Sequence, residues 1–210
     1  MFDNEGFKMI TGLHPADIRC CNHRLILVKI YAMLIFRNLL ITLGVLTSQF
    51  IIMESYAQED AAHRVKVTQA AREIMLRSGQ CALITVDKNG QPQVRTMDPF
   101  EPGDDFVIWL GTNPSSRKVA QIRNNNRVTL YYTDGGNGYV SVYGTAELIN
   151  DTQSKEKYWK QEWENFYPNK TDAYLLIKVI PERLEIISYT HGFHGNPLTW
   201  QPETVIIKKP

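Results

Sequence analysis

The sequence is poor in cysteine, and this scarcity limits how the fold can be stabilised. Of its three cysteines, only Cys81 lies beyond the first quarter of the chain. A disulfide within the patterned region after residue 57 is therefore excluded, and a hydrophobic core must hold that region together. About 150 residues bury enough surface for such a core. Cys81 stands in the apolar run Cys81-Ala82-Leu83-Ile84 and is expected to belong to the core rather than to act as a reactive thiol.

The sequence also lacks an excess of charge of either sign. Its formal net charge is +1, and basic and acidic residues are interspersed through the second half. No broad cationic face is expected, so nucleic acid is not a predicted partner. Neither an internal repeat nor a low-complexity linker is visible, and 210 residues fit one ordinary domain.

A long apolar segment precedes the patterned region. Between residues 24 and 53 the only charged side chains are Arg24, Lys29 and Arg37. Read from Met33, a short basic start leads into an apolar centre, 39–53. Polar residues interrupt this centre, and it is shorter than the roughly 20 residues needed to cross a bilayer. This pattern is typical of a removable export signal, and a retained membrane anchor is the alternative. Residues 1–32 would then be an upstream extension.

Small residues mark the predicted cleavage point. Ser55-Tyr56-Ala57 has small side chains at its first and last positions, which suits signal peptidase. We predict cleavage after Ala57, which divides the chain into an extension with its signal, 1–57, and a folded domain, 58–210. The predicted location of the domain is outside the cytoplasm, either periplasmic or extracellular, and the alternative is a membrane-anchored protein.

Hydrophobic spacing and turn residues predict short elements throughout the domain. A helix is expected over 65–78, with Gly79 as a left-handed cap, and Asn89-Gly90 should turn a hairpin. A second helix should start at 115–118 and end near 124–126, and Asp151 should cap a third that carries Tyr158, Trp159, Trp163 and Phe166. The strand-like segments are 81–86, 91–97, 106–112, 127–133, 139–150, 174–180 and 183–189.

These elements favour a mainly β fold. Many strands joined by hairpins, with few crossover helices, are typical of an antiparallel barrel rather than of a doubly wound parallel sheet. We therefore predict an antiparallel barrel of about six strands with α-helices.

The start of the second helix carries the main functional argument. Arg117 and Lys118 stand in its first turn, where the helix dipole is positive and cations are disfavoured. Free backbone N–H groups, the hydroxyls of Ser115 and Ser116, and the two cations together form a cradle for a phosphate. The alternative is that a serine caps the helix while the cations point into water. Arg95, in the middle of a strand, supports the cradle, although strand cations commonly face solvent.

Five sequence blocks in order resemble the pyridoxamine 5'-phosphate oxidase-like family. The resemblance spans about residues 65–189, and residues 158–168 and 175–188 resemble its general stress protein branch. The blocks are Val94-Arg95-Thr96-Met97, Trp109-Leu110-Gly111-Thr112-Asn113, Ser116-Arg117-Lys118-Val119-Ala120-Gln121-Ile122, Asn126-Arg127-Val128-Thr129-Leu130 and Tyr139-Val140-Ser141-Val142-Tyr143-Gly144-Thr145-Ala146-Glu147.

The resemblance implies a fold, a cofactor and a set of binding residues. The fold would be an FMN-binding split barrel, and the chain would form a homodimer with FMN in a groove between subunits. Arg117 and Lys118 would hold the FMN phosphate with help from Arg95. Thr96 and Met97 would lie on the strand that runs past the flavin, and Thr112 and Ser116 would contact its phosphate or its ribityl chain. Tyr139 falls where oxidases of the family often have a flavin-contacting glutamine, which is a departure from the pattern.

The resemblance leaves the activity open, and no catalytic side chain is nominated. The chain ends in His191-Gly192-Phe193-His194 without the arginine that grips substrate in authentic pyridoxamine phosphate oxidases, so that activity is not expected. The open readings are an FMN-dependent oxidoreductase acting on an unknown small molecule, a flavin or phosphorylated-ligand binding protein without turnover, and a haem-associated protein. The two tail histidines are a weak metal signal, so haem and metal are not predicted. Trp159 and Trp163 could cover a flavin, but packing on the barrel is the expected role.

Overall fold

The computed structural model describes residues 15–207, and within its first helix the side chains of residues 29, 31–39, 53–54 and 56–78. The chain forms two compact units, Met1–Glu59 and Asp60–Pro210. Most of the apolar centre of the expected export signal lies outside the described side chains, so the cleavage after Ala57 stays a prediction. Within the part of the chain that could be searched, no helix has the length and hydropathy needed to cross a membrane.

Helix α1 (Pro15–Ser78) is much longer than the expected helix over 65–78. Pro15 occupies its first position, where a missing N–H is tolerated, and no proline follows until Pro92. The helix ends where the sequence predicts, because Gly79 takes the left-handed conformation with φ +62°. The last turns of α1 bury Val67, Ala71 and Ile74 at helical spacing, as their pattern indicates.

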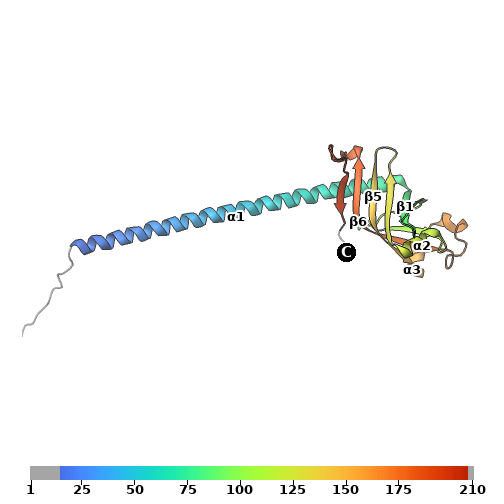
Figure 1. Cartoon of the computed structure of the whole chain (residues 1–210), viewed down its shortest axis with the longest axis horizontal. Coiled ribbons are helices and arrows are strands. Elements are labelled where there is room, and N and C mark those ends of the chain that lie inside the picture. The colour runs from blue at the N-terminus through green and yellow to red at the C-terminus, as the bar shows by residue number, and fades with distance from the viewer. Residues whose placement is uncertain (1–14, 208–210) are drawn as a thin grey trace, which may run out of the picture. The chain divides into compact units, whose positions relative to one another are not determined.

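Seven antiparallel strands form one curled sheet (Figure 1). The order is β2-β1-β4-β5-β6-β3, with β7 paired to β6. A bridge between Pro99 and Leu110 joins the segment after β2 to β3 at the other end of that order, so the sheet curls into a half-barrel. The predicted fold class, mainly antiparallel strands with a few helices, is confirmed. The strands are β1 (Cys81–Val86), β2 (Pro92–Met97), β3 (Ile108–Thr112), β4 (Arg127–Thr133), β5 (Gly138–Ile149), β6 (Leu175–Ser188) and β7 (Glu203–Ile206).

The last large strand corrects the sequence prediction. Two strands were expected on either side of Pro181-Glu182, but β6 runs unbroken through both residues. The register with β5 shifts at this point, since Tyr143 faces Arg183 while Gly144 faces Pro181. Glu182 is the extra residue of a β-bulge, and a bulge is a place where a strand tolerates proline.

The short helices agree with the prediction at their starts more than at their ends. Helix α2 (Arg117–Asn124) lies as expected, and Asp151 caps α3 (Thr152–Lys157) by accepting a hydrogen bond from the Ser154 N–H at 2.8 Å. Helix α3 then stops, and a separate 3₁₀ helix, η1 (Gln161–Asn165), follows. The prediction of a single helix that carries Tyr158, Trp159, Trp163 and Phe166 was therefore wrong.

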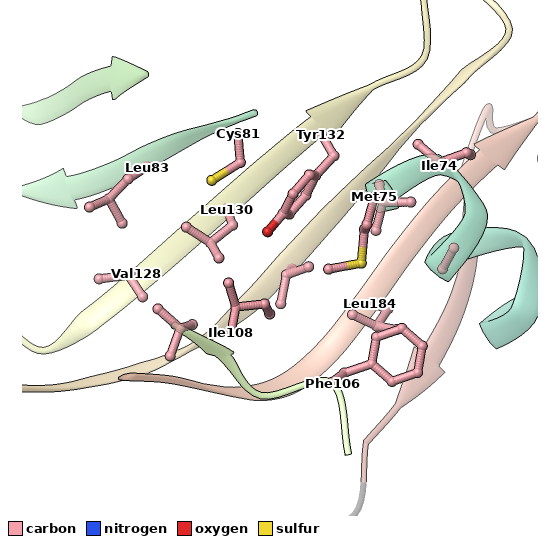
Figure 2. Packing of buried hydrophobic residues seen from close by; sticks show 14 of the residues in the cluster. Ile74, Met75, Cys81, Leu83, Phe106, Ile108, Val128, Leu130, Tyr132 and Leu184 are labelled. Atoms are coloured by element: carbon pink, nitrogen blue, oxygen red, sulfur yellow. The ribbon is translucent and has the colours of Figure 1, made fainter. Parts of the chain in front are cut away.

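The core lies on the inner face of the sheet, against the end of α1 (Figure 2). Leu83, Leu130, Val142 and Leu184 face one another across four neighbouring strands, and each is fully buried. Cys81 points into the same cluster as Tyr132 and is 3% exposed (Figure 2). Burial raises the pKa of the Cys81 thiol to about 12, which suits a core residue rather than a nucleophile.

Candidate functional site

The N-terminal turn of α2 meets the end of β3 through side-chain hydroxyls. Ser116, the N-cap residue, makes no side-chain capping bond. Its Oγ lies 3.2 Å from Thr112 Oγ1, and Lys118 Nζ donates to the same Thr112 oxygen at 3.1 Å. The Ser116 hydroxyl therefore does not cap the helix but belongs to a polar group with Thr112 and Lys118. Arg117 is exposed, as the alternative expects.

Arg95 faces the inside of the sheet rather than solvent. From β2 it donates to Thr85 Oγ1 at 2.7 Å and to Gln121 Oε1 of α2 at 2.9 Å. The Thr85 hydroxyl also donates to Gln121 Oε1, at 2.6 Å. This network fixes the Arg95 guanidinium beside α2. Cations on strands commonly face water, but here Arg95 lies close to the start of the helix.

The three cations of this region repel one another. Burial lowers the pKa of Arg95, and the nearby charge of Arg117 lowers it further. Burial also lowers the pKa of Lys118, and Arg95 adds to that effect. Among the described residues, none of the three forms an ion pair with a carboxylate within 4.0 Å. The region therefore carries concentrated positive charge that an anion would stabilise.

Two cavities open beside this cation cluster. The first, which we call the Lys118 cavity, has a volume of about 540 Å³. Its lining residues are Thr96, Met97, Asp98, Gly111, Thr112, Asn113, Lys118, Glu162, Trp163, Phe166 and Tyr167. The second, the Arg117 cavity, has about 490 Å³ and is lined by Asp87, Lys88, Asn89, Gln93, Arg117, Ala120, Gln121 and Asn124. Both volumes are in the range typical of small-molecule sites.

The structure brings together most of the residues that the sequence singles out. Thr96, Met97, Thr112 and Lys118 line one cavity, and Ser116 touches Thr112. Arg117 lines the neighbouring cavity, and Arg95 reaches toward it through Gln121.

Tyr139 lies apart from this group within the chain. It stands on the outer face of the sheet, where its ring stacks on Tyr131 with centroids 5.5 Å apart. It does not line either of the two cavities. Within the chain, Tyr139 is therefore not part of the group of residues beside α2.

Sequence reasoning raised Trp163 only as a less expected cover for a flavin, and it missed Phe166 and Tyr167 as lining residues of the Lys118 cavity. Three aromatic residues of η1 and the segment after it also line the cavity: Trp163, Phe166 and Tyr167. Trp163 Nε1 donates to Asp98 Oδ2 at 2.9 Å, a contact across 65 positions that no local pattern reveals. Trp159 packs edge-on against Trp163 and Tyr174, as the packing interpretation predicts.

The two tail histidines are engaged with protein groups. His191 Nε2 lies 3.0 Å from Glu73 Oε2, and its Nδ1 lies 2.8 Å from Ser188 Oγ. The His194 ring lies against Tyr189 in a tilted arrangement, with ring centroids 5.6 Å apart. In the part of the chain that was searched, no group of three or more potential ligands is arranged to hold a metal ion.

The curled antiparallel sheet and its few helices place this chain in the split-barrel class. Residues 67–188 match the family model described as pyridoxamine 5'-phosphate oxidase, and the chain belongs to that family. This family commonly binds flavin.

General stress proteins are among its relatives. The chain is 32% identical to general stress protein 26 of Bacillus subtilis (strain 168) over 112 residues, which cover 51% of this chain and 78% of that protein. The crystal structure of general stress protein 26 from Bacillus anthracis str. Sterne matches with a TM-score of 0.54 and 25% identity, covering 67% of this chain and 98% of the other. A related protein from Clostridium acetobutylicum also matches with a TM-score of 0.54 and 25% identity, over 64% and 90% of the two chains.

Proposed function

We propose that this chain is an FMN-binding flavoprotein that serves in redox or stress-related chemistry on a small molecule. The observation that carries the proposal is the cluster of Arg95, Arg117 and Lys118 around the first turn of α2, without a carboxylate partner among the described residues. A phosphate placed over this turn would receive backbone N–H groups and two cationic side chains. It would also offset the repulsion between cations that, after burial, lowers the pKa values of Arg95 and Lys118.

The residues present fit a phosphorylated cofactor. Arg117 and Lys118 follow each other in the chain but line neighbouring cavities, so a phosphate over the first turn would lie between them. Thr112 and Ser116 supply hydroxyls on the Lys118 side, and Thr96 and Met97 line the path beyond them. Bound FMN would supply hydride or electron transfer at its ring, while the protein orients it and excludes water. No side chain is required as a catalytic acid or base.

The test is flavin binding by the full chain. FMN is titrated and bound flavin is followed by its visible absorbance, for the wild type and for the double variant Arg117→Ala, Lys118→Ala. Because each charge-assisted hydrogen bond contributes about 1.5–3 kcal/mol, the double variant should bind at least about 100-fold more weakly. The matched control is Arg123→Ala with Arg127→Ala, which removes two exposed cations, one in the last turn of α2 and one at the start of β4. Unchanged affinity in the first variant refutes the cradle.

Turnover separates the two main readings of a flavin-bound protein. An oxidoreductase reduces its flavin with NAD(P)H, or reoxidises it with oxygen, at a rate above that of free FMN. A flavin-binding protein without turnover shows neither. We do not extend the proposal to haem, because both ring nitrogens of His191 already lie within hydrogen-bond distance of protein groups.

We also propose that two copies of the chain form a homodimer and that the domain is exported. The outer face of the sheet, with Tyr131, Tyr139 and Tyr143, supports the first proposal, since Tyr139 could reach a flavin only across a subunit boundary. The apolar segment before Ala57 supports the second. Export is tested by intact mass: cells that make the full chain should release, outside the cytoplasm, a protein that starts at Gln58. Recovery of only the uncleaved chain in membranes would favour an anchor.

A further inference from the structure

One face of α2 lines the Arg117 cavity. Arg117, Ala120, Gln121 and Asn124 recur at the i, i+3, i+4, i+7 spacing that places side chains on a single side of a helix. Ala120 has the smallest side chain of the four and therefore leaves room between the polar groups of its neighbours. The helix thus contributes a polar surface with a small residue in its middle.

The turn between β1 and β2, together with Gln93 of β2, supplies the rest of the lining. Asp87 Oδ1 accepts hydrogen bonds from the backbone N–H groups of Asn89 at 2.9 Å and Gln91 at 3.0 Å. Its Oδ2 accepts from Gln93 Nε2 at 3.1 Å. The carboxylate in this lining is therefore used within the hairpin, where it orders the turn that carries Lys88.

Gln121 has a fixed orientation in the lining of this cavity. Its Oε1 accepts hydrogen bonds from the Arg95 guanidinium at 2.9 Å and from Thr85 Oγ1 at 2.6 Å. Because an arginine can only donate, the amide oxygen must face Arg95 and the amide nitrogen must face away from it. Within the described part of the chain, Gln121 Nε2 has no hydrogen-bond partner. Gln121 thus offers an N–H donor to a ligand in the cavity that it lines.

Donor groups outnumber free acceptor charges around the cavity. Arg117 and Lys88 are cations, and neither forms an ion pair within 4.0 Å among the residues that the structure describes. The side chains of Asn89 and Asn124 form no hydrogen bond in the same part of the chain. Exposed side chains of this kind commonly bond to water, but here they meet at one cavity with the fixed donor of Gln121. An oxyanion would satisfy this arrangement.

We propose that the Arg117 cavity binds a nucleoside phosphate, with its phosphate at Arg117 and Lys88 and its base against the amide side chains. A cavity of about 490 Å³ holds more than a phosphate alone. Each amide offers a donor and an acceptor, and asparagine and glutamine pair with the N6 and N7 positions of adenine in this way. An adenine nucleotide is therefore the probe.

This nucleotide has two possible sources, the second half of a flavin dinucleotide or a separate molecule. Arg117 directly precedes Lys118, so a pyrophosphate over the first turn of α2 would join the two cavities. Only the dinucleotide rests on the proposed function, because the Arg117 cavity shares no lining residue with the Lys118 cavity.

The experiment measures the affinities of AMP, FMN and FAD for the full chain by calorimetry. The cavity variant, Lys88→Ala with Asn124→Ala, removes two lining side chains and keeps the two cations assigned to the FMN phosphate. The matched control is Lys66→Ala with Asn150→Ala, which removes the same residue types at exposed positions outside both cavities. Thermal denaturation confirms that each variant is folded.

AMP should bind the wild type, and the cavity variant should bind it about tenfold more weakly, because one charge-assisted and one neutral hydrogen bond are lost. FMN should bind all three proteins equally. If FAD binds the wild type more tightly than FMN and loses this advantage in the cavity variant, the nucleotide belongs to a dinucleotide. If AMP binds the FMN-saturated wild type while FAD binds no more tightly than FMN, the nucleotide is a separate molecule. Either result supports the inference.

Three outcomes would overturn the inference. The first is unchanged AMP and FAD affinity in the cavity variant, and the second is a wild type that binds no AMP and binds FAD no more tightly than FMN. The third is an equal loss for FMN and FAD in the cavity variant, which would assign Lys88 to the flavin phosphate. If the wild type binds AMP, the cavity variant loses it and FMN does not bind, the flavin proposal falls and this inference stands.

Discussion

Lys118 shows how a single side chain can be unfavourable for the fold and still belong to a site. Burial and Arg95 lower its pKa, which means that folding favours the neutral form over the charged one. Between the lowered folded pKa and the ordinary lysine pKa, the unfolded chain binds more protons than the folded chain. The free energy of unfolding should therefore rise with pH across that interval.

This sign gives a prediction for Lys118→Met. The wild type should gain stability between neutral pH and about pH 10 relative to the variant, because only the wild type loses the unfavourable charge. Urea denaturation at several pH values measures this difference. Inorganic phosphate at neutral pH should stabilise the wild type more than the variant. Lys66→Met, at an exposed position of α1, is the control and should show the same pH dependence as the wild type. If Lys118→Met showed that same dependence, the prediction would be contradicted.

The behaviour of individual residues explains why part of the site could be predicted. Thr96, Met97, Thr112 and Lys118 were identified from short blocks in a fixed order, and they do line one cavity. Trp163 was singled out as well, but its contact with Asp98 joins segments far apart in the sequence. Because such a contact depends on the tertiary fold, the aromatic side of the cavity could not be located from local patterns.

At the scale of elements, the backbones of β5 and β6 approach closely at the bulge, and this limits which residues β5 can carry there. Gly144 lies opposite Pro181 at the bulge, and a Cβ there would overlap the backbone of Ile180. The obstruction is main chain rather than a side-chain end, so it cannot rotate away. Gly144→Ala should therefore reduce the free energy of unfolding by about 1–3 kcal/mol, as measured by urea denaturation.

A glycine in open space is the matched control for Gly144. Gly135 has φ +52° and nothing within 4 Å of an added Cβ, and asparagine tolerates that conformation. Gly135→Asn should change stability much less than Gly144→Ala. Equal losses in the two variants would show that the contact at the bulge is not the cause.

The elements were predictable where their signals are local. The Asp151 cap, the start of α2 and the end of α1 at Gly79 all follow from residues next to them. The continuity of β6 through Pro181 depends on a bulge that only its partner strand defines. Strand β7, in the tail, has the β-branched run Thr204-Val205-Ile206, but four residues are too few to assign a strand without its pairing with β6.

At the scale of the whole molecule, the outer face of the sheet is the surface that the dimer proposal requires. The strand register sets Val94, Ile84, Thr129 and Tyr143 in one row across four strands. Val94 is 66% exposed, and Tyr131, near the middle of the same face, is 39% exposed. Stable interfaces bury about 1,200–2,000 Å² in total, and a sheet face of several strands offers that area.

A charge placed on this face should separate the proposed dimer. Tyr131→Glu would bury an unpaired carboxylate between two copies, so the variant should sediment as a monomer while the wild type sediments as a dimer. Tyr131→Phe keeps the apolar contact and should remain dimeric. Sedimentation velocity measures all three, and a monomeric wild type would refute the proposal.

Because Gly111 has no side chain, β3 can approach Trp163, one of the residues that line the Lys118 cavity. Because the Trp163 indole rests where a Cβ would stand, β3 sets the position of that ring, next to the Thr112 side chain with which the same strand reaches the cavity. Any larger residue at this position would push the indole away from Asp98 and tilt the rings above it. The lining of the Lys118 cavity thus depends on the space that Gly111 leaves for the Trp163 indole.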